Sequence, residues 1–210
     1  MTFSEGYARQ LRELHERDGG FGLGLHTGLV AQVMEFLGTK SLCDYGAGKQ
    51  VLRHSLKDKF NIDVPYYPYD PAFPEYGPAK AAELVCCIEV LEHVEPNHLD
   101  ALLMDVCRLT VRYGFLTVNT GSAKKVLLDG RNAHLIQKPI SWWLVELSRY
   151  FEIQWLGKTS LSGFALLVSP RNRNDLSLGP IEITHEHSLR GLLRMCFYRF
   201  IKEVRSRRHL

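Results

Sequence analysis

Two glutamates and a histidine stand close together near the middle of the sequence. Glu89, Glu92 and His93 directly follow the apolar run 84–88, and His134 lies in a later polar segment. Spacings of three and four would place the first three on one face of a helical turn that starts at Glu89. Carboxylates and imidazoles act as general acids and bases, and together they also bind divalent cations. Three interpretations stay open: His93 or His134 as a base, all four residues as metal ligands, or structural roles.

A glycine turn precedes this group. The apolar segment 41–43 runs into Asp44, Tyr45, Gly46, Ala47 and Gly48, and the next apolar segment ends on Asp70 and Pro71. A carboxylate at a strand end, followed by Gly-x-Gly, lets a nucleoside approach the backbone of a Rossmann-like sheet. A second acid after the next strand can accept two hydrogen bonds from ribose hydroxyls. The third glycine of the dinucleotide fingerprint is missing, since Val51 stands there, so the pattern disfavours NAD.

Alternating strands and helices are predicted to hold these residues at one sheet edge. The predicted strands are 41–44, 63–69, 84–88 and 115–118, followed by a hairpin of 151–156 and 164–168. The predicted helices are 3–16, a helix from Thr27 (as its cap) to 37, 51–59, 96–110 and 141–149. The unalternating apolar strands are typical of a parallel sheet with both faces covered. The long segment 120–139 is predicted to be a loop that is either functional or disordered.

In this order, the segments resemble class I S-adenosylmethionine-dependent methyltransferases across residues 40–170. Residues 44–48 resemble motif I, Tyr69-Asp70 resembles the ribose-binding acid, and LVCCIEVLEHVEP (84–96) resembles the segment after the fourth family strand. The resemblance implies a Rossmann-like, mostly parallel sheet with flanking helices and a terminal antiparallel hairpin. It also implies S-adenosyl-L-methionine as cofactor, bound by Asp44, Tyr45, Gly46, Ala47, Gly48, Asp70, Pro71 and Glu89.

The sequence departs from the family between Asp70 and Glu83. Family members place a helix and a strand there, whereas this chain has only the short segment 71–82. We therefore expect a sheet contracted between the second and fourth family strands. The adenine pocket stays unassigned, although aromatic and proline residues of this segment could cover the adenine ring by stacking. These residues are Phe73, Pro74, Tyr76 and Pro78.

The family resemblance predicts an O-methyltransferase for a small-molecule or sugar hydroxyl, with His93, His134 and Glu89 as catalytic residues. Bases in the long loop would suit an anionic acceptor such as an anionic glycan; they are Lys124, Lys125, Arg131 and Lys138. A first alternative is an RNA 2'-O-methyltransferase with a divalent metal, because Glu89, Glu92, His93 and His134 resemble the two-Glu, two-His set of small-RNA 3'-terminal enzymes. A second alternative is a non-catalytic protein that binds S-adenosylmethionine.

Charge divides the chain into a domain, 1–170, and a basic tail, 171–210. The tail holds nine basic and four acidic residues, a net of +5, which leaves −2 for the rest of a chain whose total is +3. This balance disfavours nucleic acid as the partner. The tail is predicted to be a linker and a basic amphipathic helix, 188–204, that docks on the domain, joins a dimer or contacts an anionic membrane surface.

The cysteines and the first twenty residues indicate in which cellular compartment the protein is expected. The five cysteines form no Cys-x-x-Cys pair, and charged residues already interrupt the apolar ones within the first twenty positions. An odd set of cysteines in apolar runs is typical of a reducing compartment. We therefore expect a cytoplasmic protein, with at most a peripheral contact at the inner membrane surface.

Overall fold

The computed structural model describes residues 2–17 and 26–171. Its strands are β1 (Leu42–Tyr45), β2 (Tyr66–Tyr69), β3 (Ala82–Ile88), β4 (Thr110–Asn119), β5 (Phe151–Lys158) and β6 (Gly163–Pro170). Its α-helices are α1 (Glu5–Arg17), α2 (Thr27–Leu37), α3 (Val51–Phe60), α4 (Leu99–Leu109) and α5 (Ile140–Ser148). Three 3₁₀ turns complete the described elements: η1 (Pro74–Tyr76), η2 (Leu91–His93) and η3 (Pro96–His98).

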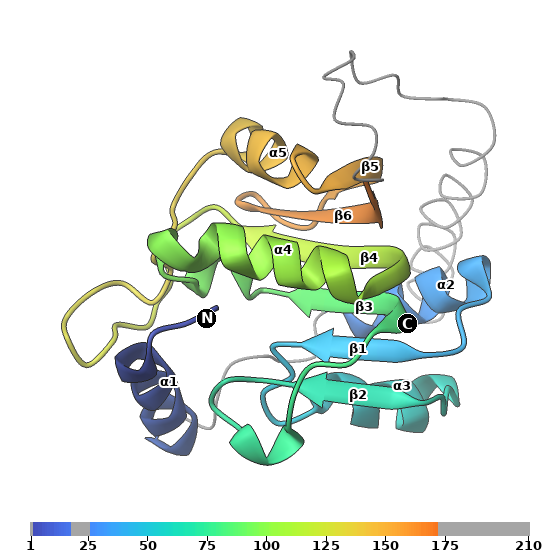
Figure 1. Ribbon diagram of the computed structural model, residues 1–210, viewed down its shortest axis with the longest axis horizontal. Coiled ribbons are helices and arrows are strands. Elements are labelled where there is room, and N and C mark those ends of the chain that lie inside the picture. Colours follow the sequence, from blue (N-terminus) through green and yellow to red (C-terminus); the bar gives the residue numbers. More distant parts are fainter. Residues whose placement is uncertain (1, 18–25, 172–210) are drawn as a thin grey trace, which may run out of the picture. The chain divides into compact units, whose positions relative to one another are not determined.

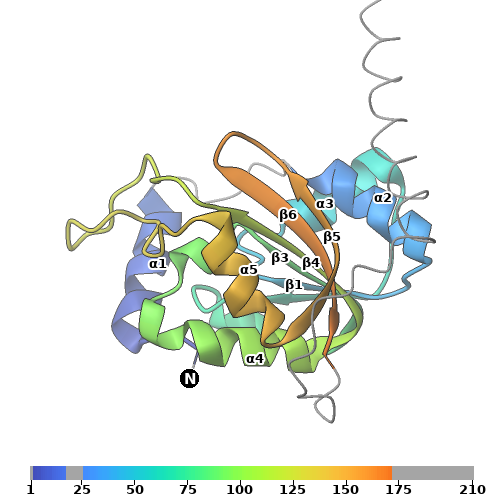
Figure 2. The ribbon, with the colours of Figure 1, turned by 90° about the horizontal axis from the view of Figure 1, so that it is seen from above.

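The six strands form one sheet in the order β2-β1-β3-β4-β6-β5. β1 pairs in parallel with β2 and β3, and β3 pairs in parallel with β4, whereas β6 runs antiparallel to both β4 and β5. Helices α4 and α5 cover one face and α2 and α3 the other (Figures 1 and 2). These features confirm the predicted α/β fold with a mostly parallel sheet and a terminal antiparallel hairpin.

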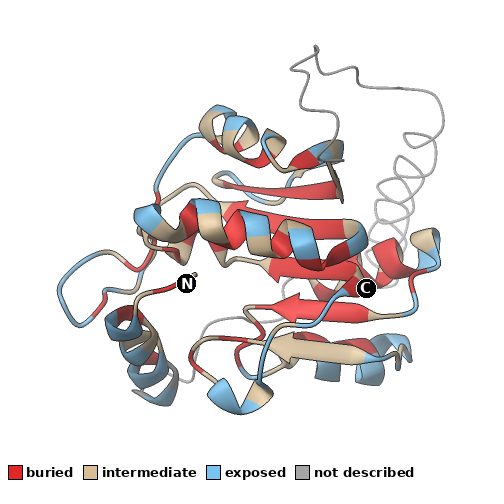
Figure 3. Ribbon diagram, viewed as in Figure 1, coloured by how far each residue is buried: buried red, intermediate tan, exposed pale blue. Residues whose placement is uncertain are grey.

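The contraction of the sheet is confirmed. β2 is an edge strand next to β1, and β3 flanks β1 on the other side. Between β2 and β3 the structure has only the short turn η1. Figure 3 shows the consequence for burial, since β1 and β3 are buried throughout most of their length while β2 is half-buried.

Parallel strands bring their carboxyl ends to one edge of the sheet. In Figure 1 the arrowheads of β1 and β3 point toward α1, which lies beyond that edge. The glycine turn after β1, the segment after β2, and the turn η2 after β3 therefore gather beneath α1. The long loop 120–139 leaves the same end of β4.

Several local predictions were wrong. Thr27 does not cap α2: His26 precedes the helix, its side chain makes no cap bond, and Thr27 is a buried first residue of the helix. The turn after β3 begins at Leu91, not at Glu89, whose φ of 54° lies in the left-handed region. The predicted helix 96–110 is divided into η3 and α4, and its last residue, Thr110, already belongs to β4.

The predicted domain boundary stays untested, because all tail residues after Arg171, including the predicted helix 188–204, lie outside the described residues. Among the described helices, none is both long enough and apolar enough to cross a membrane.

Candidate active site

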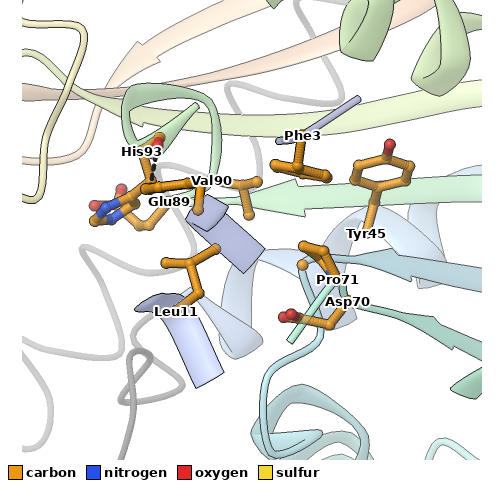
Figure 4. Close-up of a pocket in the computed structure, with 10 residues that line it drawn as sticks. Phe3, Leu11, Tyr45, Asp70, Pro71, Glu89, Val90 and His93 are labelled. Carbon is orange, nitrogen blue, oxygen red and sulfur yellow. Dashed lines mark hydrogen bonds between the residues drawn. The ribbon is translucent and has the colours of Figure 1, made fainter. Parts of the chain in front are cut away.

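A cleft lies at the carboxyl edge of the sheet, below α1. Its cavity measures about 60 Å³. Figure 4 shows Glu89, Val90 and His93 on one side of this space and Asp70 and Pro71 on another. The cleft unites most of the predicted cofactor residues with one predicted catalytic histidine and with α1. The lining residues are Phe3, Tyr7, Leu11, Tyr45, Gly46, Asp70, Pro71, Glu89, Val90 and His93.

The glycine turn is held against the end of β2 by its backbone. The amides of Gly46 and Ala47 both donate to the Tyr69 carbonyl, at 2.7 and 3.0 Å. Gly46 has a φ of 90°, and a Cβ built there would lie 2.3 Å from Val90 Cγ2. A side chain at position 46 would thus be strained and would collide with the segment after β3. Glycine is required here by the close approach of two segments that line the cleft.

Asp70 is fixed by two backbone amides. Its Oδ2 accepts a hydrogen bond from the Gly48 amide and its Oδ1 accepts one from the Ala72 amide, both at 2.8 Å. Asp70 thereby connects the glycine turn to the segment after β2, and it borders the cleft where a ribose would have to bind.

Asp44 lies differently from its predicted role. Its side chain accepts a hydrogen bond from the Tyr66 hydroxyl on the neighbouring strand, and it is not among the residues that line the cleft. Burial raises the pKa of Asp44 to about 7; the Tyr66 bond opposes this rise and the charge of Asp70 adds to it. The contribution of Asp44 to cofactor binding stays a prediction, and its visible role is to join β1 to β2.

The two predicted histidines lie together. Their ring centroids are 4.8 Å apart and the rings meet edge to face. Nδ1 of His93 lies 2.8 Å from the Ala133 carbonyl oxygen, and Nδ1 of His134 lies 2.6 Å from the Gly121 carbonyl oxygen. Because a carbonyl only accepts, each Nδ1 carries a hydrogen, and the neutral form of each ring would have its lone pair on Nε2. The loop 120–139 thus orients both imidazoles.

Glu92 shares this place and is fully buried. Its Oε1 accepts the Asn119 amide at 2.9 Å, whereas its Oε2 has no hydrogen-bond partner among the described residues. Burial raises the pKa of Glu92 well above its usual range, and the charge of Glu89 adds to the rise. Glu92, His93 and His134 each offer one atom that could bind a metal ion, and these three atoms all lie within 4.8 Å of one another.

Glu89 stands beside this cluster in a left-handed conformation at the end of β3. Its Oε1 accepts the Thr117 hydroxyl at 3.1 Å and lies 3.6 Å from His26 Nε2. Burial acts to raise the pKa of Glu89, yet the net direction is downward because His26 and Thr117 favour its charged form. The positive φ of Glu89, rather than a helical turn, directs its side chain, and Glu89 and His93 nevertheless line the same cleft.

Sequence reasoning missed His26 and the role of α1. His26 immediately precedes α2, and no spacing motif links it to Glu89. Tyr7 and Leu11 belong to the apolar stripe that predicted α1, but that stripe alone did not indicate which surface it covers. Of the predicted loop bases, Arg131 is paired with Asp129 at 2.6 Å, which reduces its availability to an anionic acceptor.

Comparisons with known proteins support the fold. No family model and no curated protein matches the sequence. DhpI in complex with SAH is 12% identical, with a TM-score of 0.55, covering 81% of this chain and 100% of that one. The Burkholderia thailandensis 1,6-didemethyltoxoflavin N1-methyltransferase is 14% identical, with a TM-score of 0.55 and coverages of 80% and 90%. The methyltransferase domain of bacterial CtHen1 is 13% identical, with a TM-score of 0.52 and coverages of 69% and 97%.

The described chain therefore has the fold of class I S-adenosylmethionine-dependent methyltransferases. The strand order and the cleft at the carboxyl edge of β1, β2 and β3 agree with this assignment.

Proposed function

We propose that this chain is an S-adenosylmethionine-dependent O-methyltransferase that acts on a small-molecule or sugar hydroxyl. One observation carries the proposal: the glycine turn, the Asp70 carboxylate and His93 border a single cleft, and His134 lies directly beside His93. The fold supplies the precedent, since DhpI has it in complex with SAH.

The residues present fit this donor. The turn at Gly46 keeps side chains away from the cleft floor, and the Asp70 carboxylate borders the cleft, where it would accept hydrogen bonds from the two ribose hydroxyls. When bound, S-adenosylmethionine supplies a methyl group on a positively charged sulfur. Tyr45, Ala47, Gly48 and Pro71 would frame it, and the Glu89 carboxylate would face its positive charge.

The chain's own residues would align the acceptor and take up its proton. In an in-line displacement the acceptor oxygen forms a bond to the methyl carbon while the carbon–sulfur bond breaks and its electron pair stays on sulfur. The hydroxyl proton passes to the Nε2 lone pair of His93 or His134. The carbonyls of Ala133 and Gly121 hold the rings so that Nε2 is the accepting atom.

An anionic glycan is the acceptor class that the loop favours. Lys124 and Lys125 lie in the loop 120–139 that carries His134. The Nζ atom of Lys138 lies over the Trp142 ring, 6.0 Å from its centroid. An aromatic face beside a cation suits a sugar that bears a carboxylate or phosphate. Trp143, in contrast, is fully buried in the core.

Two measurements test the proposal. Calorimetry should detect S-adenosylhomocysteine binding, and labelled donor incubated with separate pools of glycans, metabolites and RNA should label the first or second pool. No binding would overturn the proposal. Binding without transfer to any pool would favour the alternative of a non-catalytic S-adenosylmethionine-binding protein.

A metal-assisted RNA 2'-O-methyltransferase is a second candidate, favoured by the unpartnered Oε2 of Glu92. This oxygen is buried next to two imidazoles whose Nδ1 atoms face carbonyls, and such bonds commonly orient metal-binding imidazoles. Glu92, His93 and His134 would hold the ion, with Glu89 alongside. A divalent cation supplies Lewis-acid polarisation of a hydroxyl.

Chelation separates the two candidates. Activity that is lost with EDTA and restored by Mg²⁺ or Mn²⁺ would favour the metal, whereas activity that is indifferent to EDTA would leave a histidine base. As a readout independent of activity, Mn²⁺ should raise the thermal midpoint of the wild type but not of Glu92→Gln if the ion binds here.

A further inference from the structure

The cleft beneath α1 is too small for the donor that it is proposed to bind. Pockets for ligands of that size measure roughly 300–1,000 Å³. The cavity bordered by Asp70, Glu89 and His93 measures about 60 Å³, and Phe3, Tyr7 and Leu11 line its roof on the side of α1. In Figure 4 the Phe3 ring lies beside Tyr45. Either the floor or this roof must move for the donor to bind.

The floor is the more firmly built part. Gly46 belongs to the turn that is bonded to the Tyr69 carbonyl, and Val90 packs directly against it. Asp70 is held by two buried amide bonds. The roof is attached in another way. Tyr7 and Leu14 of α1 are buried, but the hydrogen bonds of the segment 4–12 go to Glu95, His93, Asp129 and Ala72, which lie in turns and loops after β2, β3 and β4. The roof therefore depends on loop segments rather than on strand pairing.

The two ends of α1 are attached differently. At its start, Ser4 donates two hydrogen bonds to the Glu95 carboxylate, each 2.9 Å, and the Tyr7 hydroxyl donates to the His93 carbonyl. At its other end, Arg12 donates to the Ala72 carbonyl at 3.2 Å, and Leu14 is buried. A wider cavity of about 350 Å³ already lies beneath this second end, beside Arg12 and Glu16. Of the residues in this segment, those of the first end, Phe3, Tyr7 and Leu11, line the smaller cleft.

We propose that residues 3–11 form a cover that lifts to admit S-adenosylmethionine, while the Arg12–Leu14 end of α1 stays docked. The inference rests on the proposed function. Lifting breaks the Ser4 and Tyr7 bonds, and the second of these is made to the backbone of His93 itself. Donor entry and the position of the catalytic histidine are thereby coupled, and the acceptor site is completed only when the cover closes again.

The test uses the full chain, S-adenosylhomocysteine and the variant Tyr7→Phe, which removes one hydrogen bond of the closed state and keeps the ring. A bond of this kind changes the open population roughly fivefold. Stopped-flow association of S-adenosylhomocysteine should accelerate by that factor. Tyr113→Phe is the matched control, since Tyr113 lies in β4 toward the opposite sheet edge, and it should associate at the wild-type rate. Ser4→Ala is a second variant with the same expected direction.

Hydrogen exchange supplies the second readout. S-adenosylhomocysteine should change the protection of residues 3–11 and leave the protection of residues 12–17 nearly unchanged. If Tyr7→Phe and Ser4→Ala both bind at the wild-type rate, and the ligand does not change the protection of residues 3–11, the proposed cover is overturned while the proposed function stands. Absence of S-adenosylhomocysteine binding to the wild type would overturn the proposed function and the cover with it.

Discussion

Replacing Asp70 by asparagine tests the cofactor site most directly. The carboxylate accepts two backbone hydrogen bonds and is proposed to accept bonds from the ribose hydroxyls, whereas an amide has one acceptor oxygen and directs its NH₂ group at a donor. One charge-assisted bond is worth about 1.5–3 kcal/mol. Since 1.4 kcal/mol is a factor of ten, we expect S-adenosylhomocysteine to bind roughly 10- to 100-fold more weakly.

The same substitution also lowers stability, and the two effects are separable. In Asp70→Asn the side-chain NH₂ group would face the Gly48 or Ala72 amide, which is itself a donor, and this unpaired contact lowers the unfolding free energy by about 1–3 kcal/mol. Thermal unfolding without ligand measures this cost, and calorimetry well below the midpoint measures binding. Asp63→Asn is the matched control, because Asp63 is an exposed acid paired with Lys57, and it should bind like the wild type. An Asp70→Asn protein that is folded and binds within twofold of the wild type would refute the ribose assignment.

Four further outcomes are expected. The pKa of Asp44 is about 7 in the folded protein and about 4 in the unfolded chain, so the folded state binds the Asp44 proton more tightly. The unfolding free energy should therefore fall as pH rises from about 4 to 7, by up to about 4 kcal/mol. Asp44→Asn should remove this contribution in urea titrations at pH 5 and 8. His134→Ala should lower turnover about 100-fold with unchanged donor affinity, while the exposed His54→Ala should not; equal turnover in both would exclude a base at position 134. Gly46→Ala should lower the unfolding free energy by more than about 2 kcal/mol, whereas Gly77→Ala, at a glycine with positive φ but open space, should lower it less, and equal losses would contradict the role of Val90. If the tail contacts an anionic membrane surface, full-length protein should sediment with anionic liposomes and a chain ending at residue 180 should not; identical behaviour would remove this alternative and leave docking or a dimer contact.

The sequence indicated the scaffold because its signals are local. Apolar runs ending on Asp44, Asp70 and Glu89 predicted three strands whose carboxyl ends meet, and the short segment 71–82 predicted the missing strand. The strand order confirms both points. Because helices cover both faces of the sheet, few other strand arrangements would bury these apolar strands as well.

Side-chain direction at the site was less predictable, because it depends on residues far apart in the chain. Asp44 faces Tyr66 on the neighbouring strand, a contact that a motif does not encode. Glu89 was assigned to a helical face by spacing, but its positive φ, with its amide bonded to Thr117, directs it toward His26. Neither partner lies near Glu89 in the sequence.

The contraction of the sheet and the position of α1 are connected through the site. The family places a helix and a strand between the ribose acid and the next strand, and in this chain only η1 stands there. A transferase cleft needs an element that excludes water from the reacting groups. Phe3, Tyr7 and Leu11 line the cleft in this structure, and Arg12 reaches the segment after β2, where η1 stands in place of the family's helix and strand. α1 is therefore placed to shield a donor, and under the proposed movement the same helix would also release it.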